Sequence, residues 1–189
     1  MNALAQVQGR GPAPALAGAG VADQKQYLTF LLAGEMFSID ILRIKEIIWY
    51  AGLTEVPMMP SCIRGVINLR GAVVPVMDLA ARFGKPSTPN TKSTCIVIIE
   101  VGEPGDTERQ NMGLVVDAVQ AVLEIPATEI EPPPNFGAKI RSEFIEGIGK
   151  VGGKFVIILN VGSVLSPEEI GAMGAGVARA EQAPAMALN

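Results

Sequence analysis

The sequence contains no histidine, and its two cysteines, Cys62 and Cys95, form no CxxC motif. Without histidine, His-dependent catalytic triads and His-ligated metal sites are excluded. A cysteine among apolar neighbours is usually a small buried hydrophobic residue, and such isolated cysteines are typical of proteins from a reducing compartment. The sequence therefore predicts a cytoplasmic protein with neither metal nor cofactor.

Charge and aromatic side chains are also scarce, at 18% and 5% of the residues, and the formal net charge is −4. Nucleic-acid binding relies on a basic surface and on aromatic rings that stack on bases, so we expect no nucleic-acid partner. No uninterrupted apolar run reaches the about 18 residues that a membrane helix needs. The N-terminal residues also lack the basic segment and apolar stretch of a signal peptide. We therefore expect no direct insertion into a membrane.

Hydrophobic residues, in contrast, make up 49% of the chain, which is enough for a sizeable core. They are unevenly distributed. Residues 1–24 and 171–189 are rich in Ala, Gly, Pro and Gln, and such segments bury too little apolar surface to fold. We predict a folded region over 25–170 between two flexible tails, with a Pro/Ser/Thr-rich linker at 85–93 that separates halves of about 25–84 and 94–170.

A glycine-jointed β-hairpin occurs twice in the folded region. The segment 63–79 is repeated at 145–161, 82 positions later, with Gly65 matching Gly147 and Gly71 matching Gly153. Internal repeats of this kind indicate a duplicated structural unit. In the last matched pair, Asp78 corresponds to Asn160.

The duplication extends to the preceding strands. Residues 95–102 align with 27–34 at an offset of 68, and Val116, Val119 and Val122 align with the isoleucines 41, 44 and 47 at an offset of 75. Each copy then offers about five strands, which suits a small β-barrel. We also expect a helical turn before a strand that ends at Trp49, a short helix after Asp78, and a C-terminal helix beginning at Ser166.

Candidate catalytic groups have simpler explanations. The glycines 147–153 could cradle a phosphate, but no Lys-Ser/Thr follows, which favours a turn. The carboxylate pairs Asp40/Glu46 and Asp117/Glu124 lack further polar partners in the sequence, which favours solvated charges. The serines have neither a histidine base nor a GxSxG elbow. The sequence therefore predicts no enzymatic activity.

Glu46 and Arg70 are the two charged residues set within otherwise apolar motif segments. One interpretation places one or both in a partner interface, because apolar sheet surfaces with few charges are how non-catalytic modules capture partners. The other is a structural ion pair that fixes the irregular segment near Glu46 to the hairpin. The two interpretations are compatible.

At these residues the chain resembles the CheW family, the coupling proteins of bacterial chemotaxis. The most specific elements are NLRG at 68–71, VPVMDL at 74–79 and GLVVDAV at 113–119, in that order. The matching segments are 27–34, 38–42, 44–47, 56–57, 65–71, 74–79, 113–117, Val119, 132–136 and 147–159. The departures are the Gly/Ala-rich N-terminal tail and a lengthened loop at 103–111.

The resemblance implies a mainly β fold, with two intertwined five-stranded barrels and short helices, and a non-catalytic adaptor of two-component signalling. Such an adaptor holds the histidine kinase CheA, through its regulatory domain, to the cytoplasmic tips of methyl-accepting chemoreceptors, and supports signalling arrays at the membrane. The alternative is a CheW-like regulatory module of a kinase or of a coupling protein fused to a receiver domain. Residues that match the family's receptor-side groove are Ile44, Glu46, Gly65, Arg70, Gly113 and Val116.

Overall fold

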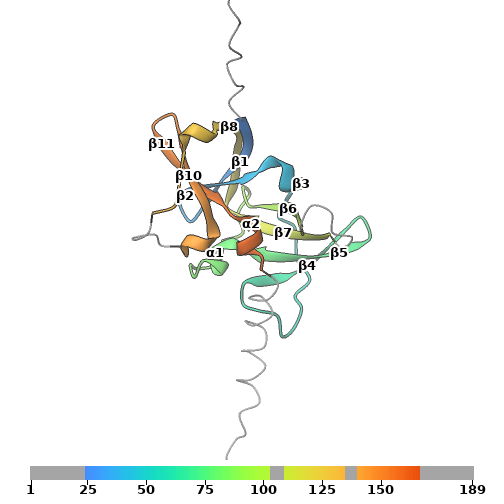
Figure 1. Ribbon diagram of the computed structural model, residues 1–189. Helices are drawn as coiled ribbons and strands as arrows, with labels where there is room; N and C mark the ends of the chain where they lie inside the picture. The colour runs from blue at the N-terminus through green and yellow to red at the C-terminus, as the bar shows by residue number, and fades with distance from the viewer. Residues whose placement is uncertain (1–23, 103–108, 135–139, 167–189) are drawn as a thin grey trace, which may run out of the picture.

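The computed structural model describes residues 24–102, 109–134 and 140–166 (Figure 1). Apart from Gln24, the two predicted tails lie outside the described residues. The same holds for most of the 103–111 loop and for the helix predicted to follow Ser166.

Strands are the main regular elements of the described chain, with four-residue helices and 3-10 turns between them, so the predicted mainly β fold is confirmed. The first half contains β1 (Gln24–Leu32), β2 (Glu35–Asp40), η1 (Ile41–Arg43), β3 (Ile44–Trp49), β4 (Ile63–Leu69), β5 (Ala72–Asp78) and α1 (Leu79–Arg82). The second half contains β6 (Cys95–Val101), β7 (Gln110–Val116), β8 (Ala118–Pro126), η2 (Ala127–Glu129), β9 (Ile130–Glu131), η3 (Ser142–Phe144), β10 (Ile145–Val151), β11 (Lys154–Leu159) and α2 (Val161–Val164). The helical turn before β3 and the helix after Asp78 were both predicted and are confirmed.

The strands form two sheets that exchange elements between the halves. Sheet I has the order β8-β1-β2-β11-β10-β9, and sheet II has the order β3-β6-β7-β5-β4. In the repeat, the counterparts of β8, β1, β2, β11 and β10 are β3, β6, β7, β5 and β4. The first five strands of sheet I therefore have the same order as the strands of sheet II. Each sheet therefore takes strands from both halves, and the predicted intertwining is confirmed. In Figure 1, sheet I occupies the upper part of the molecule and sheet II the lower part.

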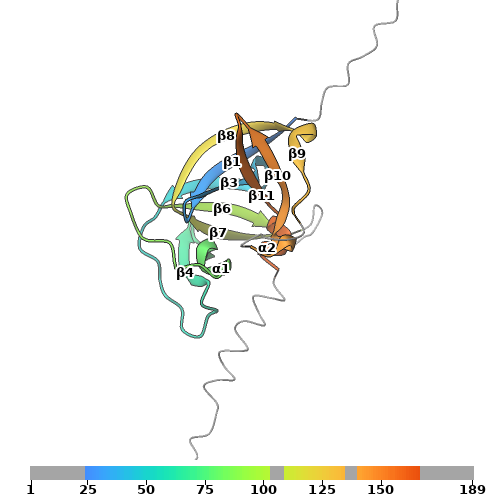
Figure 2. The ribbon, with the colours of Figure 1, turned by 90° about the vertical axis from the view of Figure 1, so that its left-hand side faces the viewer.

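The sheets curl strongly but are not closed barrels, which corrects that part of the prediction. The edge strands of sheet I, β8 and β9, are joined by η2 along the chain and not by a hydrogen-bonded ladder, and the curvature of β8 is plain in Figure 2. The edges of sheet II are joined by residues 50–62, where Thr54 bridges Val66 in β4. Pro57 and Pro60 lie in this connector, and proline has no N–H to extend a ladder.

The strand register corrects the predicted offset of the first strands. Thr29 lies opposite Ser38 in sheet I, and Ile98 lies opposite Gly113, the repeat counterpart of Ser38, in sheet II. Thr29 therefore corresponds to Ile98, at an offset of 69 and not 68. A slip of one residue turns every side chain to the other face of a strand. The sequence hides the slip because both strands are nearly continuous apolar runs.

The main core lies between the two sheets and contains buried side chains from both. Phe30, Phe37, Phe83 and Phe144 form a chain of ring contacts through it, with centroids 5.8–6.2 Å apart. The buried Arg82 donates from Nε to the carbonyl of Val164 at 2.9 Å. Val164 is the repeat counterpart of Arg82, so this contact lies where the two copies meet.

Candidate partner-binding site

The six residues proposed for the receptor-side groove all lie in sheet II. Ile44 and Glu46 lie on β3, Gly65 on β4, Arg70 in the turn between β4 and β5, and Gly113 and Val116 on β7. Arg70 is exposed and Ile44 and Glu46 are half-buried, whereas the three residues on β4 and β7 are buried. The structure thus separates three residues that can meet a partner directly from three that cannot.

Arg70 lies in an unusual hairpin turn. Leu69 pairs with Ala72, which leaves a two-residue turn in which Arg70 and Gly71 have φ of 52° and 90°. Positive φ at two central residues is typical of a type I′ turn, which favours Asn and Gly. A side chain such as arginine costs roughly 1–2 kcal/mol there. Asn68 supports the turn, because its Oδ1 accepts a hydrogen bond from the Gly71 N–H at 2.8 Å.

Arg70 and Glu46 form an ion pair, with 3.1 Å between a guanidinium nitrogen and Oε2. The pair joins the hairpin of β4 and β5 to β3, the opposite edge strand of sheet II. The side chain of Arg70 is 82% exposed and that of Glu46 is 27% exposed, and exposed pairs contribute at most about 1 kcal/mol. The contact that one interpretation anticipated therefore exists, but it leaves most of the arginine open to a partner.

The buried glycines determine the shape of sheet II. A Cβ on Gly65 would lie 2.3 Å from the carbonyl oxygen of Thr54, and its φ is +149°. A Cβ on Gly113 would lie 2.7 Å from a methyl group of Ile96. These glycines allow the 50–62 connector to approach β4 and the side chains inside sheet II to pack. Their effect on a partner is therefore indirect.

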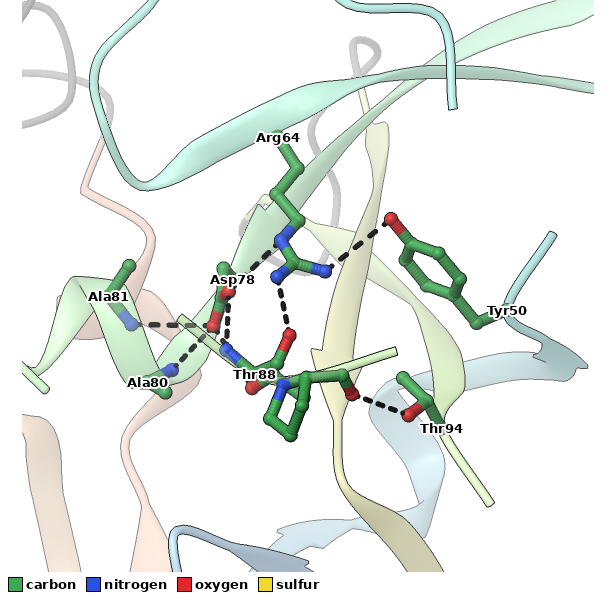
Figure 3. Close-up of polar contacts among 8 residues, drawn as sticks. Tyr50, Arg64, Asp78, Ala80, Ala81, Thr88 and Thr94 are labelled. Carbon is green, nitrogen blue, oxygen red and sulfur yellow. Dashed lines mark hydrogen bonds and ion pairs between the residues drawn. The ribbon is translucent and has the colours of Figure 1, made fainter. Parts of the chain in front are cut away.

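A buried polar network that the sequence did not reveal lies beside the hairpin (Figure 3). Asp78 is fully buried and pairs with Arg64, Nε to Oδ2, at 3.1 Å. Asp78 also accepts hydrogen bonds from the backbone N–H groups of Ala80 and Ala81, at the start of α1, and from Thr88 in the linker at 2.9 Å. The network fixes both α1 and the linker to sheet II. The sequence predicted the cap of α1 by Asp78 but not its contacts with Arg64 and Thr88.

Exposed apolar side chains provide a second feature of sheet II that sequence reasoning missed. Trp49 on β3 is 70% exposed and Val73 on β5 is 72% exposed, and Ile47 is also exposed. In sheet I, Val122 and Phe155, the counterparts of Ile47 and Val73, are exposed as well. Large exposed aromatic and aliphatic side chains are typical anchors of protein interfaces. The alternation of β3 could have indicated them.

The carboxylate of Glu100, near β3, pairs with two cations. Hydrogen bonds from Lys45 and Arg109 lower the pKa of Glu100, so that this carboxylate stays ionised between two cations. Within residues 24–102, 109–134 and 140–166, no cluster of three metal-binding side chains occurs. In the same residues no helix is long and apolar enough to cross a membrane.

Comparisons with known proteins agree on one family. The CheW-like domain family matches residues 26–169. The chain is 33% identical over 152 residues to chemotaxis protein CheW of Klebsiella aerogenes, which covers 80% of this chain and 88% of the relative. It is 33% identical to chemotaxis protein CheW of Bacillus subtilis over 76% of this chain and 88% of the relative. The crystal structure of scaffolding protein TtCheW from Thermoanaerobacter tengcongensis has a TM-score of 0.67 and 37% identity, over 75% of this chain and 87% of that one.

Proposed function

The chain belongs to the CheW family, and from this premise we propose that it is a chemotaxis adaptor that couples the cytoplasmic tips of chemoreceptors to the histidine kinase CheA. It acts by holding both partners in a fixed geometry within a signalling array, and it catalyses no reaction. Each contact is modest, and the array gains its stability from many contacts at once. This role places the protein in the cytoplasm, at the membrane-bound receptors.

One observation supports this role above the others: the Arg70 turn. Strained backbone conformations cluster at functional sites. The described non-glycine residues with positive φ are Ala33, Met58 and Arg70, and of these three Arg70 alone carries a charge. Arg70 projects an exposed guanidinium beside Glu46, on the same sheet as the exposed Trp49 and Val73. This combination of a charged residue and apolar anchors suits a protein partner better than a small substrate.

In the proposed receptor site the six residues take two different parts. Arg70, Glu46 and Ile44 contact the receptor, and their variants change affinity directly. Gly65, Gly113 and Val116 are buried and maintain the shape of sheet II, so their variants act through the fold.

The regulatory domain of CheA is proposed to bind at the ends of the two sheets. A domain of the same fold can pair with this chain in a pseudo-symmetric way, and the exposed counterparts Val73 and Phe155 lie at the hairpins of sheets II and I. The alternative role, a module of a kinase or of a receiver-fused coupling protein, is favoured by no feature of the described residues.

Titrating the purified full chain against a receptor cytoplasmic fragment and a CheA regulatory fragment tests the proposal. Arg70→Glu should weaken receptor binding about tenfold or more, because truncated interface anchors cost roughly 2 kcal/mol or above. Lys92→Glu makes the same charge change on the exposed linker and should leave binding unchanged. Binding of the unmodified protein to neither fragment would overturn the adaptor role.

A further inference from the structure

The two edge strands of sheet II, β3 and β4, approach each other across a seam. They lie at opposite ends of the sheet order, and among the described strands no ladder pairs them. In the connector between them, Thr54 donates to and accepts from Val66 of β4 at 3.0 and 2.9 Å. These two hydrogen bonds tie β4 to the connector and not to β3. Direct contact between the two edge strands therefore depends on side chains.

Two arginines provide such contacts, one near each end of β4. Just beyond the end of the strand, Arg70 pairs with Glu46 of β3 at 3.1 Å. Near its start, Arg64 donates from Nη1 at 3.4 Å to the hydroxyl of Tyr50, the residue that follows β3, and its guanidinium lies 5.6 Å from the centre of the Tyr50 ring. Arg64 and Arg70 are separated by about 20 Å along the strand. The seam is therefore held at both ends.

The two contacts differ in what else holds the arginine. The side chain of Arg70 is 82% exposed, and a partner that binds it competes with Glu46. The side chain of Arg64 is 20% exposed and pairs with the fully buried Asp78. Arg64 also donates to the Thr88 carbonyl, so that groups on three other segments fix its guanidinium, whose donors form a rigid fork (Figure 3). Arg64 is therefore the fixed contact of the seam, and Arg70 is the exposed one.

We propose that Arg64 is a positioning residue for the partner site, because by joining β4 to Tyr50 it keeps Arg70 beside Glu46. It does so without touching the partner. An exposed ion pair alone is too weak to hold two strands together, and it is lost when a partner takes up the guanidinium. The contact at Arg64 then keeps the β4–β5 hairpin in place while Arg70 is engaged. This inference rests on the receptor site proposed above.

Energy transfer across the seam tests the structural half of the proposal without a partner. Trp49, at the end of β3, is the single tryptophan, and an acceptor dye on Ala72→Cys reports the position of the β4–β5 hairpin. The dye attaches to the new thiol because both native cysteines are buried. Arg64→Lys keeps a charge beside Asp78 but loses the fork, so transfer from Trp49 should fall. Transfer equal to that of the unmodified seam would overturn the proposal.

Two further variants separate the seam from the rest of the buried network. Tyr50→Leu keeps an apolar side chain but removes the hydroxyl and the ring that Arg64 contacts, and it should lower transfer as Arg64→Lys does. Thr88→Val removes the hydroxyl that donates to Asp78 at 3.1 Å but keeps the carbonyl that Arg64 binds, so transfer should be unchanged. Circular dichroism at the same temperature checks that each variant is folded. A fall in Thr88→Val as large as in Tyr50→Leu would contradict a specific role of the seam.

Receptor titration tests whether the seam matters for binding. Arg64→Lys and Tyr50→Leu should each weaken binding of the receptor cytoplasmic fragment about fivefold, and the double variant should also lose about fivefold, because both changes break one contact. A loss of about twenty-fivefold in the double variant would show that the two residues act independently and would overturn the proposal, as would unchanged binding in both single variants. If the unmodified chain did not bind the fragment, the adaptor role would fail, whereas energy transfer would still decide whether Arg64 holds the seam.

Discussion

The two hairpins of the repeat have the same length and the same strand pairing, yet their turns differ. The β10–β11 turn is Gly152-Gly153, with φ of 56° and 77°, whereas the β4–β5 turn places Arg70 at the first of these positions. Glycine adopts this conformation without strain, and arginine does not. The comparison shows that the β4–β5 hairpin carries a local backbone cost that the β10–β11 hairpin avoids, and we propose that the exposed guanidinium of Arg70 accounts for it.

The residues at the ends of the two hairpins, Asp78 and Asn160, also differ in burial and in contacts. Asp78 is buried and holds Arg64 and the linker, whereas its counterpart Asn160 is exposed and caps α2 through the Ser163 N–H at 3.2 Å. Sheet II is therefore fixed by a buried charge network, and sheet I by a simple cap. The two copies share a backbone arrangement, but different side-chain contacts stabilise them.

We expect the largest effect on stability from a substitution at Asp78, compared with one at its counterpart Asn160. Asp78→Ala removes the partner of a largely buried arginine, which should lower the free energy of unfolding by about 3 kcal/mol. Asn160→Ala removes only an exposed helix cap and should cost about 1 kcal/mol. Urea denaturation of both variants measures the difference. Equal losses would show that the Asp78 network adds nothing beyond capping.

The close-packed glycines provide the next test. In Gly65→Ala the new Cβ meets backbone at 2.3 Å and φ is unfavourable, so we expect a loss of about 2–3 kcal/mol. In Gly147→Ala the new Cβ would meet Cγ2 of Ile130 at 2.6 Å and the Glu131 carbonyl oxygen at 3.0 Å, but φ is not positive, and we expect a smaller loss of about 1–2 kcal/mol. Thermal unfolding ranks the two. A larger loss of stability in Gly147→Ala than in Gly65→Ala would contradict the close approach of the 50–62 connector to Gly65.

Exchanging the turn residues tests the strain at Arg70. Gly152→Arg should destabilise the protein by about 1 kcal/mol, because arginine, unlike glycine, is strained at this positive φ. Arg70→Gly should leave stability within about 0.5 kcal/mol, since relief of strain offsets the lost ion pair. Chemical denaturation and receptor titration should be run together. Unchanged receptor binding in Arg70→Gly would contradict a functional turn.

A charge exchange separates the structural and the binding roles of the Glu46–Arg70 pair. Glu46→Arg and Arg70→Glu should each lower the free energy of unfolding by about 0.5–1 kcal/mol, and the double variant should recover part of the loss. Receptor binding should not recover, because the partner would meet charges in reversed positions. If the double variant regained binding as well, the pair would be structural only.

The smallest expected effects concern pH and distinguish the exposed ion pairs of the two sheets. The folded pKa of Glu100 in sheet II is lowered by Lys45 and Arg109, so its contribution is present above the unfolded pKa and is lost as pH falls through the folded pKa. The pKa of Lys150 in sheet I is raised by Glu131, so its contribution is lost as pH rises through the folded pKa. Glu100→Gln should flatten only the acid limb of a melting-temperature profile, and Lys150→Gln only the alkaline limb.

The sequence predicts the strands and the duplication because each leaves a local pattern, namely apolar alternation and glycines in register. It offers the Glu46–Arg70 contact as one of two interpretations, from a charge among apolar residues. It fails where a one-residue register decides the outcome. The offset of β1 and β6 was wrong by one for that reason. Arg64 and Asp78 were not paired because only the β4–β5 register brings them together. The exposed fraction of Arg70 also depends on how the sheet curls, which no local pattern encodes.

The exchange of strands between the two sheets has a consequence for synthesis on the ribosome. The hairpin of β1 and β2 emerges early, but its neighbours β8 and β11 belong to the second half. Its apolar residues therefore stay uncovered until nearly the whole domain has been made, and contacts between such distant segments slow folding. A ribosome pausing within the second half would hold a chain with sheet I unfinished, and that nascent chain would be the form most in need of a chaperone.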